Sequence, residues 1–249
     1  MKYFKILISY PLSVIFYMAL ISTFLISHIA QWLALNIGGY KAHKNSVDAF
    51  NFILLSCLYI LGTRIKFTNK QSIPENCPLV FVCNHQNIYD ISPIHFFLRK
   101  YHPSFVAKKE LGKGLPGISY NLRKGGSVLI DRKRPKESLR LLMEFGKYIE
   151  TNNRSAVIFP EGTRSKNGVP KRFSENGFKM IVENAPSSYV IPLTVNNSWK
   201  LSSIGSFPME LGVKITFEVH EPIKSDSLPF EQLFLKTEKV ITDAIISPK

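Results

Sequence analysis

The sequence predicts an α/β fold, a mostly parallel sheet flanked by helices, preceded by an N-terminal hydrophobic helical membrane segment. Two observations predict it. From about residue 66 onward, short apolar runs alternate with helical patterns, which is typical of parallel sheets covered on both faces. Ahead of them, residues 6–40 contain no Asp, Glu, Lys or Arg. We therefore expect membrane-anchoring helices over residues 1–65 and an α/β domain over residues 66–249.

The first charge-free run covers 35 residues, from Ile6 to Tyr40. As a helix it would be about 50 Å long, more than the hydrocarbon core of about 30 Å requires. It is too long for the apolar region of a cleavable signal peptide, which has about 7–15 residues. Pro11 near its start is compatible with a kinked or two-part helix.

The second charge-free run has 15 residues, 49–63. At about 22 Å as a helix it is short for a membrane span. An interfacial or re-entrant helix, the returning limb of a hairpin and a buried core helix all fit it. Lys2 and Lys5 precede the first run, and Lys41 and Lys44 separate the two runs, so the positive-inside rule does not choose a side. The basic remainder of the chain carries no secretory signal, which favours the cytosolic side.

Strands and helices of the α/β domain follow from periodicity and end signals. Five apolar runs predict strands: residues 79–83, 127–130, 156–159, 190–195 and 213–219. Four patterns between and after them predict helices: residues 93–99, 136–150, 173–184 and 230–246. Ser92 is the expected N-cap of the first helix, with Pro93 at its first position. In such sheets the chemistry lies in loops at the carboxyl ends of the strands.

A histidine and an aspartate five residues apart, His85 and Asp90, follow the strand at 79–83. Positions five apart lie about 140° apart on a helix, so the two side chains meet only if the chain turns between them. A carboxylate on one imidazole nitrogen fixes the tautomer and leaves the other nitrogen free to accept a proton. His43 and Asp48 have the same spacing without a preceding strand, and we expect them in a solvated or headgroup-level loop.

A second candidate segment, residues 159–165 (FPEGTRS), follows the strand expected at 156–159. Pro160 ends the strand, and Gly162 lets the backbone approach a ligand closely. The planar guanidinium of Arg164 suits a phosphate. An ordinary β-turn with an exposed ion pair explains the same residues.

Charge points to an anionic partner. The chain has 32 Lys and Arg against 18 Asp and Glu, a formal net charge of +14, and residues 100–140 alone carry +8. This balance favours nucleic acid, an anionic membrane surface or a phosphorylated metabolite. Most aromatic residues lie in apolar runs, however, which argues against a nucleic-acid groove. The three cysteines form no CxxC pair, and His85, His95 and His102 lack the spacing of a helical zinc site, so no metal is expected.

Four ordered blocks carry a family resemblance. They are Asn84-His85-x4-Asp90, Gly126–Arg132 (GSVLIDR), Phe159–Ser165 (FPEGTRS) and Val190–Leu193 (VIPL). Together they resemble the glycerolipid acyltransferases, with the bacterial 1-acylglycerol-3-phosphate (lysophosphatidic acid) acyltransferases most similar within that family. The resemblance covers about residues 66–220, and a hydrophobic N-terminus is usual in the family.

The resemblance implies roles residue by residue. His85 would be the general base on the acceptor hydroxyl and Asp90 its orienting partner. Lys108, Arg132 and Arg164 would hold the phosphate of the acceptor. Glu161, Gly162 and Thr163 would shape that pocket. The segment between the first two blocks departs from the family pattern at residues 112–125, which leaves acyl-chain length and acceptor choice open.

The activity that the resemblance implies is transfer of an acyl group from acyl-coenzyme A or acyl carrier protein to the sn-2 hydroxyl of 1-acylglycerol-3-phosphate. The product would be phosphatidic acid for phospholipid synthesis. No cofactor is expected, no nucleic acid takes part, and the enzyme would work at the cytosolic face of the bacterial inner membrane. Other acceptors stay open: a lyso-ornithine lipid, a lysophospholipid or glycerol 3-phosphate. A non-catalytic basic protein of the membrane surface is the alternative outside enzymes.

Overall fold

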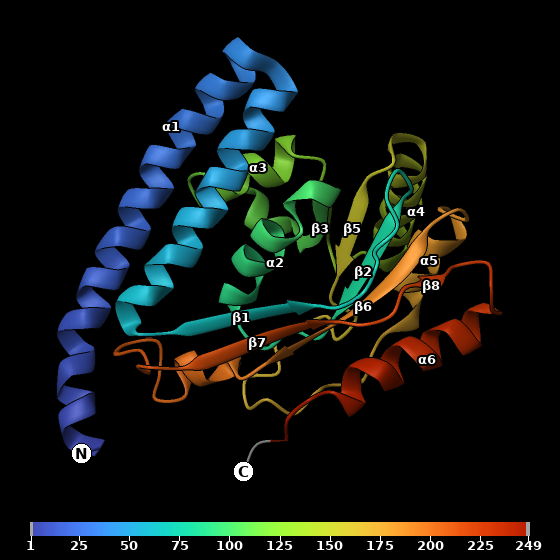
Figure 1. Ribbon diagram of the computed structural model, residues 1–249. Helices are drawn as coiled ribbons and strands as arrows, with labels where there is room; N and C mark the ends of the chain where they lie inside the picture. Colours follow the sequence, from blue (N-terminus) through green and yellow to red (C-terminus); the bar gives the residue numbers. More distant parts are fainter. Residues whose placement is uncertain (1, 248–249) are drawn as a thin grey trace.

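The computed structural model describes residues 2–247. Met1 of the expected membrane segment, and Pro248 and Lys249 of the expected α/β domain, lie outside the described residues. Its eight-stranded sheet has the order β1-β7-β6-β2-β5-β3-β4, with β8 paired to β6 (Figure 1). The strands are β1 Arg64–Asn69, β2 Leu79–Cys83, β3 Pro103–Lys108, β4 Val128–Ile130, β5 Ser155–Ile158, β6 Tyr189–Asn196, β7 Lys214–Val219 and β8 Ile223–Lys224. Among the strand pairs within residues 2–247, only those of β6 with β7 and with β8 are antiparallel. The predicted mostly parallel sheet is therefore confirmed.

The helices are α1 Lys2–Cys57, α2 Ile91–Phe97, α3 Ile118–Lys124, α4 Pro135–Asn152, α5 Glu175–Glu183 and α6 Phe230–Asp243. Single turns of 3-10 helix lie at η1 Leu58–Leu61, η2 Ile88–Asp90, η3 Arg99–Tyr101, η4 Lys109–Gly112 and η5 Ser198–Ser202. The four predicted helices correspond to α2, α4, α5 and α6. Sequence reasoning did not predict α3 or strands β1, β3 and β8.

The central strand β2 is buried on both faces, as a parallel strand requires. Phe81 packs in a core with Phe16 of α1 and Ile94 of α2. Val80 faces the opposite way, into a second core with Phe145 of α4 that also contains side chains of α5 and α6. The sheet is thus a layer between α1 and α2 on one side and α4, α5 and α6 on the other.

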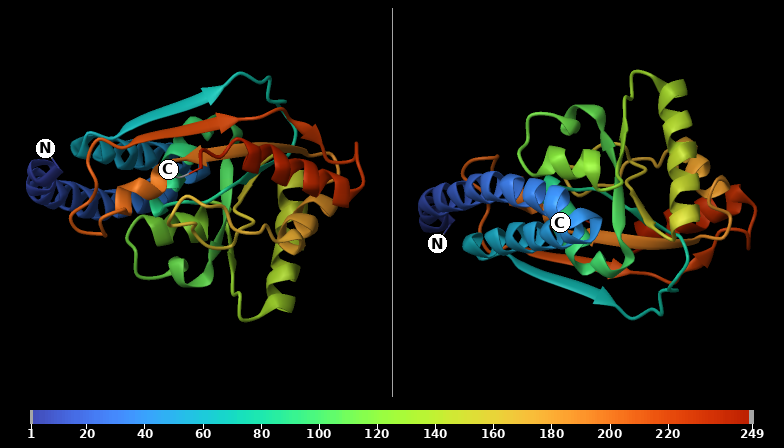
Figure 2. Two further views of the ribbon diagram at one scale, coloured as in Figure 1. Left: turned by 90° about the horizontal axis from the view of Figure 1, so that it is seen from below. Right: turned by 90° about the horizontal axis from the view of Figure 1, so that it is seen from above.

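α1 is a hairpin of two helical limbs that turn at Gly39, whose φ is 67° (Figures 1 and 2). Over residues 49–63 the structure shows the returning limb of a hairpin, and part of this limb is also buried in the core. By length and hydropathy this helix could cross a membrane, and the protein buries only 28% of its most apolar window. Because Phe16 and Leu58 lie in the core under the sheet, the hairpin packs as part of the α/β body. The boundary expected between the membrane-anchoring segment and the α/β domain, at residues 65 and 66, falls within β1. That division of the chain stays a prediction.

The helix that follows the His85–Asp90 motif, α2, begins two residues earlier than predicted. The amide of Tyr89 donates to the side chain of Asn87, which caps η2, and α2 then begins at Ile91. Ser92 is therefore not an N-cap, because the chain is already helical one turn earlier. The turn that this cap stabilises separates His85 from Asp90.

Candidate active site

Parallel pairing brings the predicted site residues to one edge of the sheet. β2, β3, β4 and β5 all run in the same direction, so their carboxyl ends meet. His85 follows β2, Lys108 ends β3, Arg132 follows β4, and the segment 159–165 follows β5. The topology alone therefore places these predicted site residues at one edge of the sheet.

His85 and Asp90 form the predicted pair. Nδ1 of His85 lies 2.9 Å from Oδ2 of Asp90, whose side chain is fully buried, while the imidazole is 16% exposed. The same Oδ2 accepts the amides of Gln86 and Asn87 at 2.8 and 2.9 Å. A carboxylate fixed in this way orients Nδ1–H toward itself and leaves Nε2 as the proton acceptor. The imidazole also stacks on Phe159, with ring centroids 4.3 Å apart.

Two asparagines that sequence reasoning did not assign hold the turn in place. Asn84 forms a reciprocal pair of hydrogen bonds with the backbone of Val195 in β6. Nδ2 of Asn87 donates to the carbonyl of Ser198 and to Oγ of Ser202, both at 3.1 Å. Asn84 belongs to the first motif block and both lie in the polar run after β2, but their hydrogen-bond partners lie more than a hundred residues away.

Glu161 connects the two motifs instead of facing a ligand. Oε1 accepts the amide of His85 at 2.7 Å, and Oε2 accepts the amide of Lys171 at 2.9 Å. From the same loop, the amide and Oγ of Ser165 donate to the carbonyl of His85 at 2.7 and 3.1 Å. Burial raises the pKa of the Glu161 carboxyl, and the two amide donors oppose that shift. These bonds fix the backbone of His85 on both sides.

Three exposed cations lie at the same edge of the sheet as this pair. Among residues 2–247, no carboxylate lies within ion-pair distance of Lys108, Arg132 or Arg164, all of which are exposed. A Cβ built on Gly162, whose φ is 67°, would lie 3.7 Å from the Arg132 guanidinium. Arg132 thus lies directly over the loop of the third block. Such unpaired cations at one edge suit a phosphate.

The structure therefore brings some predicted site residues into contact and only places others nearby. His85, Asp90 and Glu161 share one hydrogen-bond network. Gly162 lies beside the Arg132 guanidinium, while Lys108, Thr163 and Arg164 lie at the same edge. Among the described residues, no hydrogen bond joins those last three to the network.

The second H-x4-D pair behaves differently, and the expectation of a solvated loop is wrong. His43 is buried in the hairpin, where its ring packs against Tyr120. Asp48 instead bonds to Nε2 of His95 at 3.2 Å and to Nζ of Lys44 at 2.6 Å. The helix continues through this segment, so positions five apart point to different faces.

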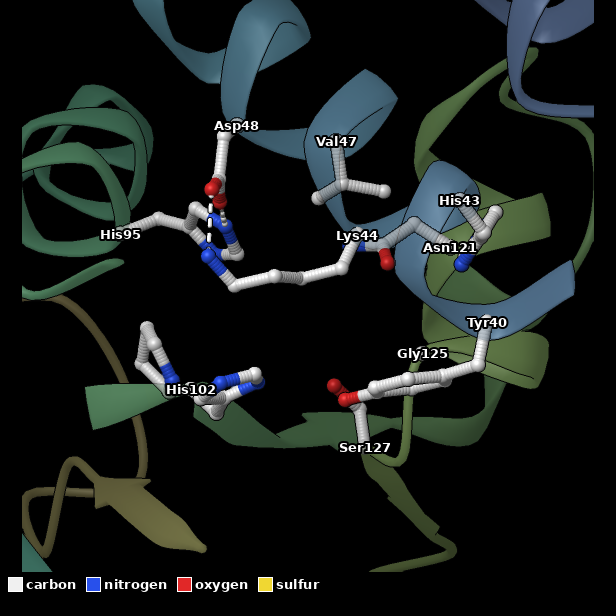
Figure 3. A pocket seen from close by; sticks show the side chains of 11 residues that line it. Tyr40, His43, Lys44, Val47, Asp48, His95, His102, Asn121, Gly125 and Ser127 are labelled. Carbon is white, nitrogen blue, oxygen red and sulfur yellow. Dashed lines mark hydrogen bonds and ion pairs between the residues drawn. The ribbon is translucent and has the colours of Figure 1, made fainter. Parts of the chain in front are cut away.

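Figure 3 shows His43, Lys44, Asp48 and His95 around a small cavity. Pro103 at the start of β3 and Ser127 just before β4 also line it, so it lies at the amino ends of the strands. This is the sheet edge opposite His85. The cavity is therefore separate from the candidate active site.

Comparisons with known proteins agree with the motifs. A family model described as Acyltransferase matches residues 64–196. The 1-acyl-sn-glycerol-3-phosphate acyltransferase of Helicobacter pylori is 35% identical over 174 residues, which are 69% of this chain and 69% of that protein. The human 1-acyl-sn-glycerol-3-phosphate acyltransferase alpha is 28% identical over 138 residues, 55% of this chain and 48% of the relative, so this chain spans about half of it.

One solved structure matches almost the whole chain. The crystal structure of the 1-acyl-sn-glycerophosphate (LPA) acyltransferase PlsC from Thermotoga maritima superposes with a TM-score of 0.75. The match covers 98% of this chain and 96% of that chain at 22% identity, which supports the fold. The resemblance drawn from the four blocks is confirmed.

Proposed function

The chain belongs to the acyltransferase family, and from this premise we propose that it acylates the sn-2 hydroxyl of 1-acylglycerol-3-phosphate to give phosphatidic acid. The observation that carries the proposal is the base and its orienting carboxylate at the same sheet edge as three exposed cations. No side-chain nucleophile is needed, because the acceptor itself brings the hydroxyl. The name of the Helicobacter pylori relative supports this choice of acceptor.

The reaction follows from the geometry of the turn. Nε2 of His85 takes the proton of the acceptor hydroxyl as its oxygen attacks the thioester carbonyl. A C–O bond forms, the C–S bond breaks, and the thiolate leaves and is reprotonated. Asp90 stabilises the imidazolium that forms in between. Base catalysis contributes about 10²–10⁴-fold, and positioning supplies much of the remainder.

The donor is proposed as an acyl thioester of coenzyme A or of acyl carrier protein, with no cofactor. Lys108, Arg132 and Arg164 would bind the acceptor phosphate, and Gly162 and Thr163 would leave room for it. A phosphate can then offset the unpaired positive charge at this edge. Glu161 acts on the site by holding the backbone of His85.

The apolar hairpin fits an enzyme whose acceptor and product are lipids. We propose that α1 attaches the enzyme to the cytosolic face of the bacterial inner membrane, with the carboxyl ends of the strands near the headgroups. An anionic membrane surface would attract the basic segment at residues 100–140.

The test is thiol release from palmitoyl-coenzyme A by the purified enzyme in micelles, with lysophosphatidate, glycerol 3-phosphate, a zwitterionic lysolipid or no acceptor. Release only with lysophosphatidate is expected. Preference for another acceptor would make the acceptor assignment wrong. No release with any acceptor, from either coenzyme A or carrier-protein donors, would refute the activity.

A matched pair of variants tests the site. His85→Ala should abolish transfer, whereas His43→Ala, in the other H-x4-D pair, should retain it once equal folding is established by circular dichroism. Equal loss of transfer in both folded variants would contradict the assignment of His85.

A further inference from the structure

A loop of the α/β body lies along the first limb of α1. It comprises residues 203–211 of the connection between η5 and β7. The amide of Met209 donates to Oγ of Ser13 at 2.8 Å, and the hydroxyl of Tyr17 donates to the carbonyl of Ser206 at 2.6 Å. Lys5 forms an ion pair with Glu210. Three residues of α1 are thus bonded to three residues of the loop, although the two segments are far apart in sequence.

The tip of this loop exposes large apolar side chains. Ile204 and Phe207 are 41% and 51% exposed, and residues 201–209 contain no charged residue. The ring of Phe207 packs edge-on against Tyr10 of α1, with centroids 5.6 Å apart. Nothing within residues 2–247 covers the outer faces of these side chains.

The exposed tip continues an apolar stripe on α1. Tyr3, Leu7, Tyr10 and Val14 are all exposed, and their spacing places them on one face of the helix. Because Tyr10 contacts Phe207, the stripe and the loop tip form one surface. We call these four residues together with Ile204 and Phe207 the tip patch. Contiguous apolar surfaces of this kind mark interaction sites.

We propose that the tip patch inserts into one lipid leaflet, so that the loop at residues 203–207 is a second membrane contact supplied by the α/β body itself. A lipid surface is the occupant favoured by continuity with the long apolar face of α1. Unpaired cations at the carboxyl edge of the sheet would complement anionic headgroups. The choice of lipid rests on the proposed function, whereas insertion itself can be tested without activity.

The same loop is connected to the catalytic turn at both of its ends. Ser202, just before it, accepts a hydrogen bond from Asn87 at 3.1 Å. Near its other end, Sδ of Met209 lies 4.0 Å from the hydroxyl of Tyr89, which donates to it. Tyr89 also packs against Phe16 of α1, with ring centroids 5.5 Å apart. Insertion of the loop would therefore hold the His85–Asp90 turn at the depth of the acceptor headgroup.

Site-directed labelling tests insertion. An environment-sensitive fluorophore is attached to Phe207→Cys or, as a control, to Leu235→Cys on α6, which is 62% exposed in the opposite helical layer. Cys77→Ser removes the half-buried thiol, while Cys57 and Cys83 are buried and should not react. Full-length variants are reconstituted in vesicles of phosphatidylglycerol and phosphatidylethanolamine, some carrying nitroxide-labelled acyl chains.

The expected result is blue-shifted emission at position 207 that lipid nitroxides quench, with aqueous, unquenched emission at position 235. Aqueous emission at 207 in vesicle-bound protein would overturn the proposal. A blue shift without nitroxide quenching would also overturn it, because a second copy of the chain would then cover the patch. Neither outcome depends on acyl transfer, so failure of the proposed function is detected separately.

An activity measurement tests the link to the turn. Phe207→Ser should raise the KM for acceptor presented in vesicles about tenfold and leave turnover of a short-chain, monomeric acceptor near that of the parent enzyme. Phe207→Trp should restore the vesicle KM, and Leu235→Ser should change neither value. Equal effects of Phe207→Ser on both acceptors, in a variant that unfolds at the Tm of the parent enzyme, would contradict the proposal.

Discussion

Replacing Asp90 with Asn separates the charge of this side chain from its structural role. In the structure one carboxylate oxygen accepts hydrogen bonds from Nδ1 of His85 and from the amides of Gln86 and Asn87. An Asn side chain keeps a carbonyl oxygen for the two amides but has no charge to stabilise an imidazolium. We expect Asp90→Asn to fold and to lose most of its turnover.

The magnitude follows from the bond that is lost. A hydrogen bond to a charged group is worth about 1.5–3 kcal/mol. If that stabilisation is lost only in the transition state, kcat falls by about 10- to 150-fold, since about 1.4 kcal/mol is tenfold in rate. If the new amide instead donates to Nδ1 of His85, it selects the wrong tautomer, and the loss approaches the full contribution of the base, about 10⁴-fold.

The assay combines thiol release at saturating substrates with thermal unfolding, and Asp90→Ala is the control. Alanine leaves the buried amides of Gln86 and Asn87 without an acceptor, at about 1–3 kcal/mol each. For a chain of this size its Tm should fall by at least about 4 °C relative to Asp90→Asn. Wild-type kcat in Asp90→Asn, or equal Tm losses in the two variants, would refute the reasoning.

Three further outcomes are expected. Arg164→Ala should raise the KM of the acceptor about tenfold and leave the donor KM nearly unchanged, because it removes a charge-assisted bond to phosphate; a change confined to the donor KM would contradict this role. Glu161→Ala should lower the unfolding free energy by about 1–3 kcal/mol per unpaired amide, measured by thermal unfolding, and also lower kcat because the backbone of His85 loses its support. Burial, assisted by the charge of Arg154, lowers the pKa of His102 to about 4. The unfolded chain, in which the His pKa is about 6.5, therefore binds a proton more readily than the folded chain. The free energy of unfolding consequently falls as the pH falls from about 6.5 to about 4. The loss is at most about 3 kcal/mol, and it is smaller because water partly screens the ring. Asparagine tolerates the left-handed φ of 50° at this position. His102→Asn should therefore flatten the pH dependence of the unfolding free energy, measured by denaturant titration. An unchanged pH dependence would show that His102 is not its source.

Local signals predicted the central parts of the fold. β2 has the predicted bounds, because Leu79–Cys83 is an uninterrupted apolar run that is buried on both faces. β1 was not predicted, because its alternating, partly exposed residues pack only at the edge of the sheet beside β7. β3 begins at Pro103 and ends in a lysine, so its apolar part is too short to stand out.

For the site, the sequence was informative where chemistry is local. His85 and Asp90 are five residues apart, and the break after β2 already indicated a turn. The hydrogen bonds of Asn84 and Asn87 were not predictable, since their acceptors on and after β6 are brought close only by strand order. The return of α1 had one local signal, the glycine pair that includes Gly39, which sequence reasoning did not use.

The burial of Phe16 has a consequence for work with this enzyme. This side chain is fully buried and belongs to the same core as the central strand β2. Deleting the hairpin to obtain a detergent-free protein would therefore open the core beneath the catalytic turn. Replacing outward-facing residues such as Leu7, Ile15 and Ile26 with polar ones would change the solvent preference of the surface and leave that core intact.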